Sequence, residues 1–307
     1  MSDTTDIGTA STLPVNVQIP GYRLRRQAGS DSIGLWFDVE QESLGRKVTL
    51  KILKPQYEQH EAARREFLTE MDRLAALDHP NLPRVLDTMR GDLLVLVIER
   101  VGAKTLETLL RPGKSLGVGP SLQHAVGVAR ALDYLADRGL AHKNVCPSLI
   151  ALRDQGGCRL VTFRNVVTLE QLAALKGRLA QAAAYVAPEQ LAGEDPVGAT
   201  AHVYHIGALV FHMVAGRPPH GPGDMREVAR AHLTEDFPSL KRFVPFQDRG
   251  IYDFVAACTQ RSPEARPDLQ TVVEALEKML EGKDPELEGY GQKAAPAPRP
   301  RRRRRRR

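Results

Sequence analysis

The pattern of apolar residues changes at about residue 102, and this change limits the folds open to the chain. Before it lie two apolar runs, residues 48–53 and 93–98, each as short as a buried strand. Between them, apolar residues recur at helical spacing from Ala63 to Leu77, and Pro80 follows. The sequence therefore predicts a small strand-rich part with one helix, followed by a larger helical part.

Three helices are predicted after residue 102 from their apolar faces and end signals. Ser121 is a candidate N-cap for the first. The second covers residues 203–214 and is closed by Gly216, because glycine adopts the left-handed conformation that ends many helices. Asp268 is a candidate N-cap for the third, which ends before Gly282.

Composition divides the 307 residues into three segments. Residues 1–19 are rich in Ser, Thr and Asp, which predicts a flexible leader. Residues 20–282 carry the periodic patterns and form the predicted domain, with a first lobe over 20–102 and a second over 103–282. Residues 283–307 turn to Pro, Ala and Arg, which predicts a disordered basic tail.

The formal net charge of +6 comes from the tail. Arg299 and residues 301–307, all arginine, contribute eight positive charges, and removing them leaves −2 for the rest of the chain. A near-neutral domain is not a basic nucleic-acid-binding fold. Affinity for nucleic acid or anionic lipid is therefore predicted only for the tail. Two other roles of the tail stay open: a solvated segment without a fixed partner, or the cytoplasmic flank of a membrane helix.

Cysteine usage favours a reducing compartment. Cys146, Cys158 and Cys258 are odd in number and widely spaced, and no CxxC pair occurs, which argues against disulfides and zinc sites. No apolar run reaches the length of about 18 residues that a membrane span needs, and the polar N-terminus does not resemble a secretory signal. The predicted location is cytoplasmic.

An ordered set of motifs carries a family resemblance. They are residues 29–36 with Gly29 and Gly34, Lys51, Glu70, residues 78–82 (DHPNL), His142, residues 185–190 (YVAPEQ), residues 216–219 (GRPP) and Arg266. The set resembles a protein kinase domain, most of all the serine/threonine kinases of bacteria, over residues 21–281. The resemblance implies an α+β, bilobal fold with a small antiparallel β lobe that contains one helix, and a larger helical lobe.

The resemblance also implies a nucleotide pocket. Lys51 and Glu70 match the ion pair that positions the phosphates of ATP in the family. The other candidate pocket residues are Gly29, Gly34, Trp36, Thr49, Ile98, Glu99, Val101 and Ala151. Trp36 stands where the family has a valine, and we expect its large indole to fill part of the pocket above Ala151.

The positions that handle charge in the family are changed. The catalytic aspartate is Asn144, the lysine that steadies the transferred phosphoryl group is Cys146, and the two metal-binding positions hold Leu149 and Thr162. An amide is not a carboxylate base, and leucine has no oxygen to offer a metal. The prediction is that no catalytic site is intact and that no metal binds. No cofactor is expected, although ATP without Mg²⁺ is a candidate ligand.

The resulting hypothesis is a pseudokinase, a catalytically inactive scaffold or allosteric regulator that binds a kinase, a phosphatase or a signalling complex. Residues 62–77 and 167–184 are the candidate contact segments. Two alternatives stay open: an atypical, weakly active ATP-dependent serine/threonine kinase, and polyanion binding through the arginine tail. The oligomeric state is left unassigned.

Overall fold

The computed structural model describes most of the chain outside its two ends. The described residues are 19–30, 33–100, 104–143, 145–153, 156–161, 166–168, 184–192, 198–221, 223–285, 287 and 290. The chain divides into two compact units. The first comprises residues 1–111 and 123–174, and the second comprises residues 112–122 and 175–307.

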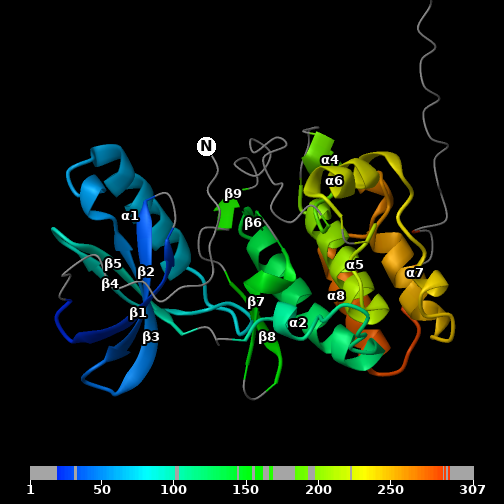
Figure 1. Cartoon of the computed structure of the whole chain (residues 1–307), viewed down its shortest axis with the longest axis horizontal. Helices are drawn as coiled ribbons and strands as arrows, with labels where there is room; N and C mark the ends of the chain where they lie inside the picture. The colour runs from blue at the N-terminus through cyan, green and yellow to red at the C-terminus, as the bar shows by residue number, and fades with distance from the viewer. Residues whose placement is uncertain are drawn as a thin grey trace, which may run out of the picture. The chain divides into compact units, whose positions relative to one another are not determined.

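A five-stranded antiparallel sheet forms the first part of the first unit (Figure 1). Its strands lie in the order β1-β2-β3-β5-β4. They are β1 (Tyr22–Ser30), β2 (Gly34–Gln41), β3 (Arg46–Leu53), β4 (Val85–Arg90) and β5 (Leu94–Glu99). The predicted strands at 48–53 and 93–98 are thus confirmed as β3 and β5, which are hydrogen-bonded neighbours.

Alternation along β3 separates two faces of this sheet. Val48, Leu50 and Ile52 lie on one face in a core cluster with residues of the neighbouring strands. Thr49 and Lys51 point to the other face, because successive side chains of a strand alternate. Helix α1 (Glu61–Ala75) lies beside the sheet and confirms the predicted helix (Figure 1).

The rest of the first unit consists of a helix and short strand pairs. Helix α2 (Val118–Ala136) begins within the second unit and continues into the first. Strand β6 (Leu140–His142) pairs with β9 (Val166–Thr168), and β7 (Ile150–Leu152) pairs with β8 (Cys158–Leu160). Single 3₁₀ turns occur at Pro55–Tyr57, Leu106–Thr108 and Pro147–Leu149.

The second unit is helical over its described residues. Its elements are α4 (Pro188–Ala192), α5 (Thr200–Ala215), α6 (Met225–Thr234), α7 (Arg249–Cys258) and α8 (Leu269–Leu280), with 3₁₀ turns at Leu240–Arg242 and Pro263–Ala265. A Cβ on Gly207 of α5 would come within 2.7 Å of Cys258 Cβ. A glycine is therefore required where α5 meets the end of α7.

The helix-end predictions are confirmed at two of three places. Gly216 follows α5 with φ +70°, and the Asp268 carboxylate accepts a hydrogen bond from the amide of Thr271 at 2.7 Å. The prediction of Ser121 as an N-cap is wrong, because Ser121 lies inside α2 and its hydroxyl donates to the carbonyl of Gly117 at 2.5 Å. Serine hydroxyls bond the carbonyl four residues back as readily as they cap a helix, so the residue type alone does not distinguish the two positions.

The predicted fold class is confirmed. The small antiparallel sheet with one helix and the larger helical part are both present, in the predicted order along the chain. None of the described helices is long and apolar enough to cross a membrane. Leucines at residues 169, 172, 175 and 179 recur at helical spacing, which predicts a helix there, and this segment falls outside the described residues.

Candidate nucleotide-binding site

An ion pair between strand β3 and helix α1 is the centre of the candidate site. The ammonium of Lys51 contacts the Oε2 atom of Glu70. The Lys51 side chain is only 1% exposed and that of Glu70 19%, so this pair is far better shielded from water than a surface pair. The Oε1 atom of Glu70 is buried and has no hydrogen-bond partner among the described residues.

Two anchors hold α1 in the position that brings Glu70 to Lys51. Near its start, the guanidinium of Arg64 donates to the carbonyls of Gly91 and Asp92 at 3.0 and 3.2 Å. Near its end, Arg73 donates to the carbonyl of Val166 in β9 at 2.9 Å. The ion pair thus depends on contacts from both ends of the helix.

Aromatic rings enclose the Lys51 ammonium. Its Nζ atom lies 5.0 Å from the ring centroid of Trp36 and 5.2 Å from that of Phe67, within the range of cation–π attraction. Trp36 is opposite Lys51 in the pairing of β2 with β3 and is 6% exposed. The indole is therefore buried beside the ammonium, and a phosphate that approaches Lys51 must displace the groups that cover it.

Replacing Trp36 with valine is expected to lower stability and raise nucleotide affinity together. Losing most of a buried indole costs about 2–4 kcal/mol in the free energy of unfolding. It also opens a path to the Lys51 ammonium, so the shift of the unfolding midpoint on adding ATP grows. Thermal unfolding of both proteins with and without ATP measures the two effects. A variant with an unchanged ATP shift would show that Trp36 does not close the site.

The other predicted pocket residues lie in the first unit. Thr49 and Ile98 are opposite one another in the pairing of β3 with β5, and Ala151 is in β7; all three are buried. Gly29 is opposite Trp36, and Gly34 begins β2. Glu99 ends β5 and its Oε1 atom is 2.7 Å from Arg159. Val101 is outside the described residues.

Only part of the predicted catalytic loop is described. Cys146 is buried, its sulfur lies 3.2 Å from the hydroxyl of Ser148, and burial raises the pKa of its thiol. That pKa change disfavours the reactive thiolate. Leu149 is half-buried and ends a 3₁₀ turn. Asn144 and Thr162 lie outside the described residues, as do Asp31 and Phe163.

The family resemblance also implies a hydrophobic stack of Leu74, Leu86, His142 and Phe163, of which Phe163 lies outside the described residues. Leu74 and His142 are buried, and His142 Nε2 bonds the carbonyl of Val161 at 2.9 Å. Leu86 packs against the core cluster on the sheet face away from Lys51.

The family resemblance also implies a structural ion pair between Glu189 and Arg266, and the second unit contains this pair. The two guanidinium nitrogens lie 2.7 and 2.8 Å from the two carboxylate oxygens, and both side chains are buried. The pair joins the start of α4 to the residues before α8.

Two histidines of the second unit, the half-buried His212 and the buried His232, pair with tyrosines. The hydroxyl of Tyr185 lies 2.6 Å from Nδ1 of His212, and that of Tyr204 lies 2.6 Å from Nδ1 of His232. Burial lowers the pKa of His212 to about 4 and that of His232 to about 3, and His220 next to His232 lowers the latter further. No cluster of metal-ligating residues occurs among the described residues.

These histidines predict that stability falls as the pH falls below about 6.5. The unfolded chain binds their protons at that pH and the folded chain does not, so each contributes a loss of about 1.4 kcal/mol per pH unit. Urea unfolding between pH 7 and pH 5 measures the slope, and His212→Gln should flatten it. An unchanged slope in that variant would mean that other groups cause the loss.

Comparison with known proteins agrees with this architecture. The sequence model described as protein tyrosine and serine/threonine kinase matches residues 29–276. The chain belongs to this protein kinase family. It is 29% identical to the serine/threonine-protein kinase PkaA of Streptomyces coelicolor over 78% of this chain and 44% of the relative. It is 28% identical to the serine/threonine-protein kinase PknA of Mycobacterium tuberculosis over 75% of this chain and 55% of the relative. The chain thus spans about half the length of these relatives.

These comparisons contradict the prediction of a catalytically inactive scaffold. The relatives bear the names of serine/threonine-protein kinases, and nothing in the comparison indicates inactivity. They favour the alternative, an atypical active kinase. The physical reason is that phosphoryl transfer depends mainly on positioning and electrostatics. The family's catalytic aspartate and metal-binding asparagine are replaced by Asn144 and Leu149, and these replacements predict a slower reaction rather than no reaction.

Proposed function

We propose that this chain is an ATP-dependent serine/threonine protein kinase domain with weak, atypical activity. The observation that carries the proposal is the buried ion pair of Lys51 with Glu70. Lys51 and Glu70 stand at the positions of the ion pair that holds the phosphates of ATP in the family that the sequence resembles. The family and the names of its relatives support the same function.

The residues present fit a nucleotide better than they fit a metal pair. Lys51 would hold the phosphates of ATP, which supplies the phosphoryl group when bound, and Glu70 would keep the ammonium in place. Asn144 would orient the acceptor hydroxyl through its amide oxygen. Leu149 offers no oxygen, so we propose that ATP binds without a full set of protein ligands for Mg²⁺.

The proposal predicts a slow reaction. Ordinary protein kinases turn over about 1–100 times per second, and removing a general base or its equivalent typically costs a factor of about 10²–10⁴. The purified full chain, incubated with γ-labelled ATP and either Mg²⁺ or EDTA, is expected to transfer label slowly to serine or threonine, as identified by mass spectrometry. The absence of both label and any ATP-induced rise in the unfolding midpoint would overturn the proposal.

A cytoplasmic location and polyanion binding by the arginine tail are part of the proposal. The three cysteines are free and buried, as suits a reducing compartment, and burial raises the pKa of Cys158 to about 12. The tail, residues 299–307, has the charge to bind nucleic acid or anionic lipid.

A further inference from the structure

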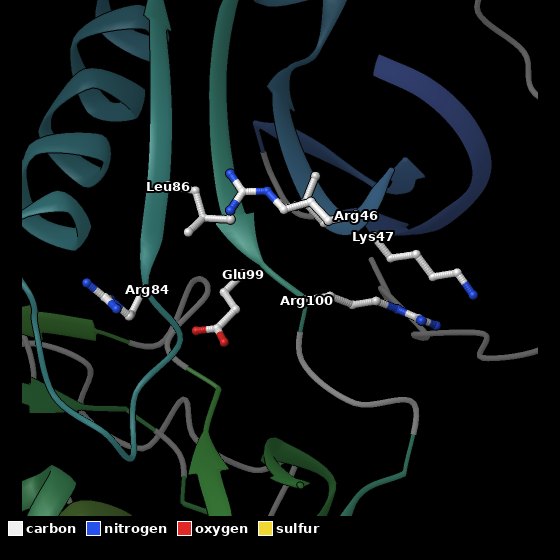
Figure 2. A pocket seen from close by; sticks show the side chains of 7 residues that line it. Arg46, Lys47, Arg84, Leu86, Glu99 and Arg100 are labelled. Carbon is white, nitrogen blue, oxygen red and sulfur yellow. The ribbon is translucent and has the colours of Figure 1, made fainter. Parts of the chain in front are cut away.

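A basic cavity of about 420 Å³ lies at the ends of strands β3, β4 and β5 (Figure 2). Four cationic side chains line it together with Glu99 and Leu86: Arg46, Lys47, Arg84 and Arg100. An adjoining hollow of about 360 Å³ shares Lys47 and Arg100 and adds Arg25 and Arg26. All of these residues belong to the first unit.

The side chains of Lys47 and Arg100 make no hydrogen bond or ion pair with a described side chain, and Glu40, which is opposite Lys47 in the pairing of β2 with β3, acts on Lys47 only through its charge. Their neighbours are already occupied: Arg25 contacts Glu40, Arg26 lies 2.6 Å from Asp38, and Glu99 lies 2.7 Å from Arg159. Figure 2 shows the Lys47 and Arg100 side chains extending in the same direction. Two adjacent cations at a cavity favour an anion with more than one charge, and a phosphate carries about −1.5 to −2.

Glu99 favours a phosphorylated peptide over a free anion. Its Oε2 atom is buried and has no hydrogen-bond partner among the described residues. A carboxylate oxygen accepts N–H groups, which a peptide has and inorganic phosphate lacks.

The register of the sheet brings the start of β1 near this cavity. Tyr22 at the start of β1 is opposite Gln41, and Gln41 is opposite Arg46 at the start of β3. Two strand spacings, about 10 Å, therefore separate Tyr22 from Arg46. Residues 1–18, the part of the leader outside the described residues, would span about 60 Å when extended, so reaching the cavity would require little of their length.

The composition of the leader complements the cavity. Residues 1–18 hold two aspartates, six serines and threonines, and no lysine or arginine. The C-terminal tail, with its arginines, would be repelled instead.

We propose that the basic cavity binds the chain's own leader, residues 1–18, when a serine or threonine in it is phosphorylated. In that modification the hydroxyl oxygen bonds to the γ-phosphorus of ATP, the bond to ADP breaks, and the hydroxyl proton passes to solvent. Self-modification would rest on the proposed function, whereas the docking holds for a phosphate from any kinase. The leader would then be fixed against the sheet end formed by β1, β3 and β5.

Synthetic peptides test the docking independently of catalysis. Fluorescent peptides of residues 1–18, unmodified or phosphorylated at Thr12, are titrated with phosphatase-treated full chain and followed by anisotropy. The phosphopeptide is expected to bind at least tenfold more tightly than the unmodified peptide. The double variant Lys47→Gln, Arg100→Gln should weaken its binding at least tenfold.

A charge-matched control separates this site from general attraction to positive charge. Arg65 and Lys241 are exposed and lie outside the cavity, so Arg65→Gln, Lys241→Gln should leave the dissociation constant within about twofold. Equal weakening by both double variants would overturn the proposal. So would equal binding of a scrambled phosphopeptide, inorganic phosphate that displaces the peptide at equal concentration, or a preference for anionic vesicles or RNA. Equal unfolding midpoints of the three proteins would confirm that each is folded.

Discussion

Replacing Arg266 with alanine is expected to lower the free energy of unfolding by about 3–5 kcal/mol. The guanidinium bonds both carboxylate oxygens of Glu189 and also donates to the carbonyls of three residues: Gln260 at 2.7 Å, Thr200 at 3.1 Å and Arg261 at 3.0 Å. Alanine would leave the Glu189 carboxylate, which is 5% exposed, charged and unpaired. Burying an uncompensated charge is among the most costly single changes in a protein.

Urea unfolding of the full chain measures this loss. Arg249→Ala is the matched control, because Arg249 is 86% exposed and its pair with Asp253 on the same helix turn is worth no more than about 0.5 kcal/mol. Arg266→Lys should give an intermediate loss, since lysine keeps the charge but lacks the planar fork that engages both oxygens. If Arg266→Ala were no more destabilising than Arg249→Ala, the pair would be structurally dispensable.

Replacing Lys51 with alanine is expected to reduce phosphoryl transfer at least 100-fold and to remove the ATP-induced rise in the unfolding midpoint. Lys51 is the buried cation at the site, and its removal leaves Glu70 to repel the phosphates. A ligand present at about 100 times its dissociation constant stabilises the folded state by about 2.7 kcal/mol, so loss of binding is readily visible.

A surface lysine provides the control for this prediction. Lys241 is exposed and lies in the second unit, so Lys241→Ala should keep both the transfer rate and the midpoint shift. Glu70→Gln separates charge from shape, because the amide keeps a hydrogen bond to the ammonium without its negative charge. Transfer that survives in Lys51→Ala would assign the activity to a contaminating kinase or to another site.

Local patterns predicted the elements that short-range forces specify. The apolar runs at 48–53 and 93–98, the helical spacing from Ala63 and the cap at Asp268 each depend on neighbours a few residues away, and each is present in the fold. Ser121 shows the limit, because the same hydroxyl serves at a cap or within a helix.

The motif order also predicted which charged residues would pair over long separations. Lys51 meets Glu70, and Glu189 meets Arg266, as the resemblance implied. Reading the substituted positions as complete loss of activity was wrong, because the identity of a side chain shows which group is missing but not how much of the rate the remaining geometry sustains.

Sequence by itself thus determined the change from a strand-rich part to a helical part, several of the elements in each, the family and the ion pairs that its motifs mark. Only the tertiary structure decided the rest: the Trp36 ring beside Lys51, the tyrosine–histidine pairs of the second unit, and the basic cavity that brings Lys47 together with Arg100. The members of each group belong to different strands or helices, and the number of residues between them follows no regular spacing. Their proximity follows from strand register and packing, which no local pattern encodes.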